Sequence, residues 1–281
     1  MVAASAHDGL STADFQRLRE GCRGLFGVTI PEGKKGLAEA RLKSLARSLG
    51  GKHDVKGLVR AFVSGNGDPG IRTGIVDALT TNHTYFMRET DHFDLFTQRV
   101  LPQLEKELGR SRDLRMWCAA AATGEEPWTL AMLLREHFGS SYKQWQAGLL
   151  ASDISTRALA VARDGVYSEE AVGRLSSSLR ERYFEPAGKD LLRVKDKLRK
   201  DTVFRRFNLA SETWNFRRKF DVVFCRNVLI YFEGPEMDAV IEKMAACIRP
   251  GGWLFIGMAE TLRRDQEHFE FVSTGAYRRR S

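Results

Sequence analysis

The chain has 281 residues, of which 43% are hydrophobic and 28% charged, and its formal net charge is +8. This composition is sufficient for a packed core and excludes wholesale disorder, and no apolar run approaches the ~20 residues of a membrane-spanning helix. The positive charge favours an acidic partner, which could be nucleic acid, anionic lipid or an acidic protein.

Residues 1–80 predict a small helical bundle. Apolar side chains recur at helical spacing in four segments, and in the first of these Phe15, Leu18 and Cys22 fall on one stripe. Glycine-rich breaks at residues 50–51 and 65–70 separate the later segments.

From about Leu114 onward, short apolar runs alternate with amphipathic helices. The runs cover residues 114–118, 148–152, 203–207, 220–225 and 253–257. The clearest helix is predicted over Pro235–Ile248, with a proline near its first turn and two glycines just beyond its end. Strands that alternate with helices form parallel sheets with crossover helices. We therefore predict an α/β fold with a Rossmann-like domain, joined to the bundle by residues 81–113.

The loop after the first predicted strand, residues 119–127, indicates a ligand site. Ligands of open parallel sheets bind beyond the carboxyl ends of the strands, and the small residues AAAATG allow close approach to the backbone. Thr123 and Glu126 match a capping box, which predicts that a helix starts at once. The loop lacks the G-x-G-x-x-G pattern of a dinucleotide site. Glu125 and Glu126 would repel a phosphate and attract a cation, or they simply favour the helix dipole.

The second predicted strand ends at Asp153. An acidic residue at this place commonly accepts hydrogen bonds from ribose hydroxyls. The alternative is that Asp153 caps the next helix, over residues 154–163. Together with the preceding loop, the carboxylate favours a nucleoside ligand.

Cysteine and histidine positions predict no metal site. The cysteines form no C-x-x-C pair and the six histidines form no zinc pattern, so we expect reduced structural thiols. The cysteines are Cys22, Cys118, Cys225 and Cys247. The segment Met1–Gly9 lacks the basic start and apolar stretch of a signal peptide, so we expect a cytoplasmic protein.

Four motifs together resemble the CheR-type chemotaxis receptor methyltransferases, in order and spacing and over nearly the whole chain. They are residues 80–89 (TTNHTYFMRE), 119–127 (AAAATGEEP), 220–232 (FDVVFCRNVLIYF) and 249–255 (RPGGWLF). The resemblance implies an N-terminal helical domain over residues 1–80 that docks on the receptor. It also implies an S-adenosylmethionine-dependent methyltransferase domain over residues 81–281, with a small inserted β-subdomain at about residues 183–206.

The resemblance also implies a role for each matching position. Asn82, Thr84 and Arg88 contact the methionine or adenosine part of the cofactor, Glu125 lies near its amino group, Asp153 holds the ribose, Asn208 and Leu209 flank the adenine, Arg226 and Asn227 close the site, and Tyr231 lies near the transferring methyl group. From the residues alone, each has a structural alternative as a helix cap, a turn residue, a surface ion-pair partner or a core aromatic.

Methyl transfer to a carboxylate explains why no catalytic triad is found. Glutamate has a reference pKa of about 4.3, so the nucleophile is ionised at neutral pH without a general base. The enzyme aligns the reacting atoms and strips water from the carboxylate. Arg88 or Arg226 could orient that carboxylate, although a strong salt bridge would reduce its nucleophilicity. The neutral Tyr231 phenol is a weaker hydrogen-bond donor and would reduce it less.

Basic residues indicate where an acidic receptor would dock. Residues 1–80 carry 12 Lys+Arg against eight Asp+Glu. A solvated surface is the alternative to receptor docking for these charges. In the β-subdomain, residues 185–191 form a short connection in place of the longer glycine-rich loop of family members that bind a receptor C-terminal pentapeptide. We therefore expect this protein to act independently of such a peptide.

Two other functions compete with this prediction. A nucleic-acid methyltransferase fits the net charge, but the segment Cys225–Val228 is not the Asn-Pro-Pro-Tyr type that holds a flipped base, so we expect no nucleic-acid partner. A non-catalytic S-adenosylmethionine sensor is the second alternative. We expect a monomer that acts on the cytoplasmic methylation helices of chemoreceptors without inserting into the membrane.

Overall fold

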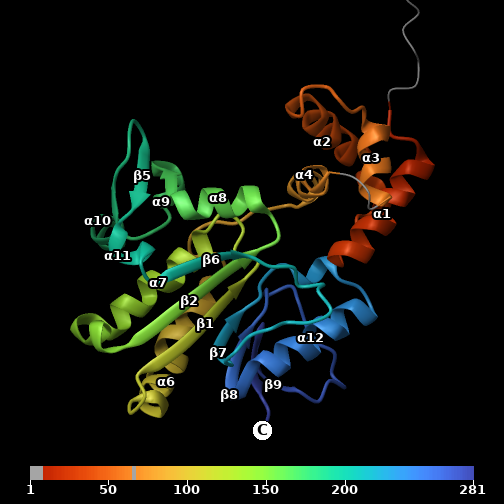
Figure 1. Cartoon of the computed structure of the whole chain (residues 1–281). Coiled ribbons are helices and arrows are strands. Elements are labelled where there is room, and N and C mark those ends of the chain that lie inside the picture. The colour runs from red at the N-terminus through yellow and green to blue at the C-terminus, as the bar shows by residue number, and fades with distance from the viewer. Residues whose placement is uncertain (1–8, 65–67) are drawn as a thin grey trace, which may run out of the picture.

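The computed structural model describes residues 9–64 and 68–281, which form a helical bundle and an α/β domain (Figure 1). The prediction for Met1–Gly9, apart from Gly9 itself, and part of the predicted break at 65–70 fall outside these residues. Within the described part of the chain, no helix is long and apolar enough to cross a membrane.

The bundle matches the helices predicted over residues 1–80. Its elements are α1 (Thr12–Phe26), the 3-10 helix η1 (Glu32–Lys34), α2 (Lys35–Ser48), α3 (Val55–Val63) and α4 (Pro69–Leu79). The Ser11 side chain accepts a hydrogen bond from the Asp14 amide at the start of α1, and Gly27 ends this helix in the left-handed conformation. The predicted stripe of Phe15, Leu18 and Cys22 is buried in a core of its own.

The α/β domain is built on a seven-stranded sheet, which confirms the predicted Rossmann-like fold. Its order is β6-β2-β1-β7-β8-β10-β9. The strands are β1 (Asp113–Ala119), β2 (Gln146–Asp153), β6 (Thr202–Arg206), β7 (Phe220–Phe224), β8 (Ile248–Phe255), β9 (Phe269–Ser273) and β10 (Ala276–Arg279). The first five run parallel, and β10 and β9 add an antiparallel edge that was not predicted.

Helices cover both faces of the sheet. They are α5 (Thr90–Leu95), the π-helix η2 (Phe96–Val100), α6 (Leu101–Leu108), α7 (Glu125–Phe138), the 3-10 helix η3 (Gly139–Gln144), α8 (Thr156–Asp164), the 3-10 helix η4 (Leu229–Tyr231) and α12 (Pro235–Cys247). Alternate residues of β1 serve the two faces: Met116 packs in the core with η2, α6 and α7, and Trp117 packs in the core with α12. The predicted connection 81–113 is therefore part of the domain core, because Phe96 and Leu104 are buried in it.

The inserted β-subdomain is a separate three-stranded sheet of order β3-β5-β4. It comprises β3 (Val166–Ser168), α9 (Glu169–Val172), α10 (Ser177–Tyr183), β4 (Phe184–Pro186), β5 (Leu191–Val194) and α11 (Asp196–Arg199). It thus begins before residue 183, where the sequence placed its start. Residues 202–206 pair with β2 in the main sheet and lie outside the subdomain.

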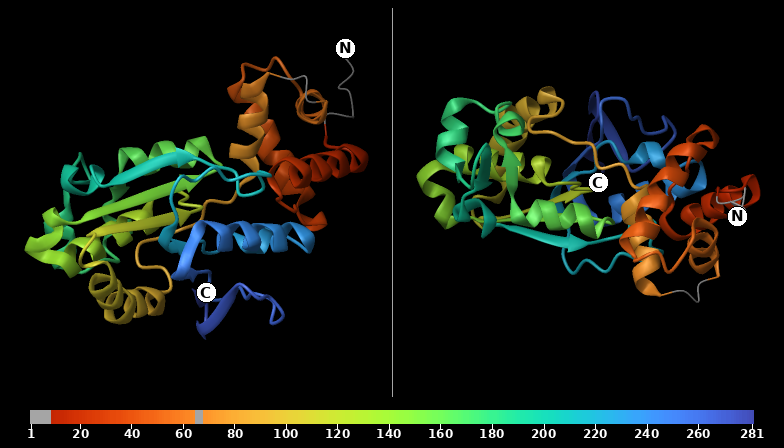
Figure 2. Two further views of the ribbon diagram at one scale, coloured as in Figure 1. Left: turned by 60° about the horizontal axis from the view of Figure 1, so that its bottom comes forward. Right: turned by 90° about the horizontal axis from the view of Figure 1, so that it is seen from above.

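The bundle lies over the carboxyl ends of the parallel strands (Figure 2). Asp77 of α4 accepts hydrogen bonds from the Ser155 and Thr156 hydroxyls at the start of α8, both at 2.7 Å. On the other side, Arg23 of α1 pairs with Glu236 of α12 at 2.8 Å. These polar contacts hold the two parts of the chain around one cleft.

Candidate active site

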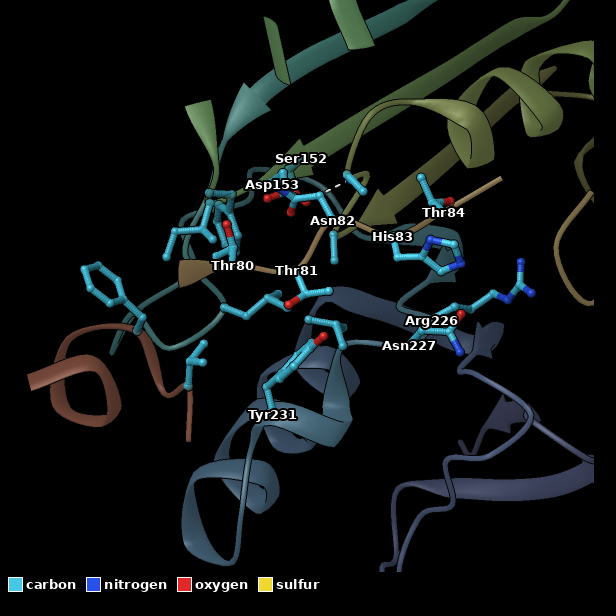
Figure 3. A pocket seen from close by; sticks show the side chains of 18 of the residues that line it. Thr80, Thr81, Asn82, His83, Thr84, Ser152, Asp153, Arg226, Asn227 and Tyr231 are labelled. Carbon is cyan, nitrogen blue, oxygen red and sulfur yellow. Dashed lines mark hydrogen bonds between the residues drawn. The ribbon is translucent and has the colours of Figure 1, made fainter. Parts of the chain in front are cut away.

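A cavity opens where β1, β2 and β7 end and the bundle closes over them (Figure 3). Its lining encloses about 940 Å³ of space between atoms, open solvent included. Phe26 and Val28 of the bundle, Ile154, and Phe207 and Leu209 form its apolar walls. Polar groups enter from several elements, so the cavity suits a ligand with both an apolar and a charged part.

Most of the sequence-predicted site residues line this cavity. Those that do are Asn82, Thr84, Arg88, Asp153, Asn208, Leu209, Arg226, Asn227 and Tyr231. They come from the first and third motifs and from the ends of β2 and β6, which lie far apart in the sequence, and the fold brings them together. Glu125 is the exception.

Glu126, and not Glu125, faces the cavity. Gly124 is the N-cap of α7 in the left-handed conformation, without a side-chain cap, so the predicted capping box between Thr123 and Glu126 does not form. The Thr123 hydroxyl instead donates to Glu125 at 2.7 Å, which turns Glu125 away. Glu125 is 8% exposed, and burial raises the pKa of its carboxyl above the usual value.

The loop before α7 is held in a strained backbone conformation. Ala120 and Ala122 both have positive φ, at 66° and 46°, which costs an L-residue free energy and persists only where the surroundings enforce it. Asn227 on the opposite wall has φ 57°. The described residues include seven non-glycine positions with positive φ, and these three line the cavity. Strain of this kind concentrates at functional sites.

Arg226 holds two carboxylates at the base of the cavity. Its side chain is fully buried and pairs with Glu126 at 2.7 Å and with Glu89 at 2.8 Å. Asn227 donates to the same Glu89 at 3.0 Å, and the Met258 amide does so at 3.1 Å. These hydrogen bonds and the guanidinium charge hold the pKa of Glu89 below its usual value in spite of its burial. The terminal nitrogens of Arg226 donate to Glu126, Glu89 and the Arg88 carbonyl, so this residue positions both carboxylates.

Asp153 is likewise engaged by the surrounding backbone. One carboxylate oxygen accepts the Ala122 amide and the other the Ser155 amide, both at 2.8 Å. Burial raises the pKa of Asp153 above the usual value, and these hydrogen bonds oppose the shift. Ser155 is the N-cap of α8, so Asp153 does not fill the capping role considered above. It fixes the strained loop while it lines the cavity.

Residues 80–88 cross the cavity as an extended strap, which Figure 3 shows passing between Asp153 and Tyr231. Arg88 at its end donates to the His83 carbonyl at 2.9 Å. On the opposite side, Asn208 donates to the Leu25 carbonyl of α1 at 2.8 Å, and this contact joins the cavity wall to the bundle.

Tyr231 lies at the end of η4 below the strap (Figure 3). Its carbonyl accepts the Thr29 amide at 2.9 Å, which fixes the backbone against the bundle. Its side chain is half-buried, and no hydrogen-bond partner for its hydroxyl is present among the described residues. The phenol is therefore available to a bound molecule.

Sequence reasoning gave no site role to Glu89 and Glu260, and it gave Glu126 the attraction of a cation without naming it as a cofactor contact. Glu260 accepts the Asn227 amide at 2.9 Å and the Gly257 amide at 2.6 Å, and so holds the loop after β7. Glu89 could have been predicted, because it directly follows Arg88 in the motif of residues 80–89. Glu260 carries no local signal. The four cysteines are buried and free, as predicted. The described residues, 9–64 and 68–281, hold no group of three or more Cys, His, Asp or Glu side chains placed to bind a metal ion.

Comparison with known proteins agrees with this geometry. Residues 82–278 match the family model described as CheR methyltransferase, SAM binding domain. Similar proteins include "Chemotaxis protein methyltransferase" of Borreliella burgdorferi, 34% identical, with 90% of this chain and 89% of the relative covered. "Chemotaxis protein methyltransferase 2" of Pseudomonas aeruginosa is 38% identical, with 88% and 86% covered. "Chemotaxis protein methyltransferase 1" of the same species is 36% identical, with 93% and 95% covered.

Proposed function

Because this chain belongs to the CheR methyltransferase family and is thereby an S-adenosylmethionine-dependent methyltransferase, we propose that it methylates glutamate side chains of chemoreceptors. The products would be glutamate methyl esters, which serve sensory adaptation, and S-adenosylhomocysteine. The observation that carries this proposal is a cavity lined by the Glu126 carboxylate and by the Tyr231 phenol, which has no hydrogen-bond partner among the described residues, since this combination suits a cationic methyl donor and an ionised acceptor.

The residues of the cavity fit S-adenosylmethionine, which supplies a methyl group activated by a positively charged sulfur. Glu126 would receive the cofactor ammonium, in the role first given to Glu125. Asp153 would accept the ribose hydroxyls, and Phe207 and Leu209 would flank the adenine. Arg226 and Glu89 would hold Glu126 in place.

The protein's work in the transfer step is alignment. The carboxylate nucleophile is already ionised at neutral pH, so no side chain has to remove a proton. S-adenosylmethionine would supply the methyl group, and the residues of the cavity would hold it in line with the carboxylate oxygen. Tyr231 would donate a hydrogen bond to the attacking carboxylate and orient it, and the bundle would exclude water.

We infer that the bundle is the receptor-docking domain and that the β-subdomain works without a receptor tail peptide. The β4–β5 connection is closed by a hydrogen bond from the Ala187 amide to the Leu191 carbonyl at 2.9 Å, which leaves only residues 188–190 between them. Binding of a receptor C-terminal pentapeptide at micromolar concentration would contradict this inference.

The deciding experiment measures transfer of labelled methyl from S-adenosylmethionine to chemoreceptor-containing membranes of the source cell. We expect base-labile label that disappears when the receptor glutamates are replaced by alanine. Asp153→Ala should abolish the transfer, and Asp164→Ala, an exposed carboxylate at the end of α8, is the matched control that should retain it. Label on RNA or DNA would favour a nucleic-acid methyltransferase, and cofactor binding without any transfer would favour a sensor.

A further inference from the structure

Arg88, which lines the cavity, and a second arginine share one aromatic ring. The guanidinium carbon of Arg174 lies 4.5 Å from the centroid of the Tyr85 ring, and that of Arg88 lies 5.9 Å from the same centroid. Arg88 lines the cavity, whereas Tyr85 and Arg174 lie outside its lining. The ring thus connects a cation of the site to a cation of the surface, and the two guanidinium carbons are at most about 10 Å apart.

Arg174 is exposed, and it comes from the β-subdomain, between α9 and α10. No ion pair or hydrogen bond engages its guanidinium within the part of the chain that the structure describes. The cation–π contact with Tyr85 positions the group while its N–H donors remain available, and a guanidinium held in this way suits a carboxylate.

The position of this pair relative to the cavity is fixed by its neighbours. Phe86, next to Tyr85 in the strap, is 1% exposed and packs edge-on against Tyr167 and Phe184 of the β-subdomain, with ring centroids 5.1 and 5.7 Å apart. The Tyr167 hydroxyl donates to the Thr123 carbonyl of the cofactor loop at 2.7 Å. The strap, the β-subdomain and the loop before α7 are therefore one packed unit.

We propose that Arg174, presented by Tyr85, is a specificity-determining residue that binds a second carboxylate of the substrate helix, one turn away from the glutamate that receives the methyl group. This inference rests on the proposed function. Side chains three or four residues apart on a helix lie about 5–6 Å from each other at Cβ. Two glutamates at this spacing can therefore extend, one into the cavity and the other to Arg174. The enzyme should therefore prefer a substrate helix that carries two acidic residues on one face.

The test compares two helical receptor fragments that carry the same target glutamate. One has glutamate and the other glutamine at the position three or four residues away. We expect Arg174→Gln to lower kcat/KM on the glutamate-containing fragment by roughly threefold to tenfold, and to change kcat/KM on the glutamine-containing fragment by less than about 1.5-fold. Cofactor affinity should not change, because Arg174 does not line the cavity.

Arg193→Gln is the matched control, since Arg193 is exposed in β5 of the same subdomain. It should leave both fragments unaffected, which separates a local contact from loss of general charge attraction. Equal activity of wild type and Arg174→Gln on the glutamate-containing fragment, or an equal loss on both fragments, would overturn the inference.

Failure of the proposed function can be distinguished from failure of this inference, because the wild-type enzyme would then methylate neither fragment. In that case, binding of the two fragments to the enzyme loaded with S-adenosylhomocysteine provides the same comparison without transfer. A preference for the glutamate-containing fragment that Arg174→Gln removes supports the inference, and the absence of any preference overturns it.

Discussion

The Arg226 guanidinium at the end of β7 and the Glu126 carboxylate in the first turn of α7 lie 2.7 Å apart, on the boundary between cavity and core. With Glu89 on the other side of the guanidinium, the group carries two carboxylates against one cation. A buried arrangement of this kind contributes little net stability compared with apolar side chains, but removal of one partner leaves uncompensated charge.

Replacement of Arg226 should therefore destabilise the whole α/β domain. We expect Arg226→Met to lower the free energy of unfolding by about 3–5 kcal/mol, measured by urea denaturation. Arg217→Gln, a change at an exposed arginine, is the control and should stay within about 0.5 kcal/mol. Combining Arg226→Met with Glu89→Gln and Glu126→Gln should recover part of the loss. Full stability of Arg226→Met would show that the carboxylates do not depend on this cation.

Substitutions at the two glutamates of the α7 first turn should affect the Kd for S-adenosylmethionine differently. Glu126→Gln should raise the Kd for S-adenosylmethionine about tenfold or more, as expected for a lost contact between charged groups. Glu125→Gln should change it less than threefold, because this side chain is buried against Thr123 outside the cavity. Isothermal titration calorimetry distinguishes the two variants. The reverse result would restore the role that the sequence motif assigned to Glu125.

Tyr231 should affect transfer more than binding. Loss of its hydroxyl in Tyr231→Phe preserves the ring and removes one hydrogen bond to an ionised group, so we expect kcat to fall about tenfold or more while the cofactor Kd stays within twofold. Single-turnover methyl transfer at saturating cofactor measures this effect. If kcat were unchanged, Tyr231 would line the cavity without taking part in the transfer step.

His92 should make stability pH-dependent. Burial, together with the Arg226 charge, lowers the pKa of this imidazole in the folded state below its usual value, against the opposing effects of the Thr274 carbonyl and of the Glu89 and Glu126 carboxylates. The unfolded chain then binds the proton more readily. The contribution of neutral His92 is fully present above the unfolded pKa of about 6.5 and is lost as pH falls toward the folded value.

The measurement is the free energy of unfolding between pH 7.5 and 5.5. The wild-type value should fall more steeply than that of His92→Gln, by up to about 1.4 kcal/mol per pH unit below pH 6.5. Parallel curves for the two proteins would mean that His92 titrates alike in the folded and unfolded chain.

The sequence predicted the parallel strands and the cavity-lining motifs because each depends on local pattern. Apolar runs such as residues 220–225 determine their own strand, and polar residues directly after a parallel strand gather at one edge of the sheet. The β-subdomain bounds were missed because α9, α10 and β4 separate β3 from its partner β5 along the chain, and so short a strand gives no periodic signal. The sequence placed the start of the helix at Thr123, whereas Gly124 is the N-cap of α7, and Glu126 rather than Glu125 lines the cavity.

Gly27 has consequences beyond ending α1. A side-chain carbon there would approach the Phe232 ring to 2.4 Å, and Phe232 also forms part of the cofactor cavity wall. The helical bundle thus touches the cofactor site directly, through Phe26, Val28 and the backbone around Gly27. Binding free energies at two sites that share such a wall are linked reciprocally. If the receptor docks on the bundle as proposed, any change that it causes in cofactor affinity equals the change that the cofactor causes in receptor affinity. Release of spent cofactor and release of the receptor would then be coupled.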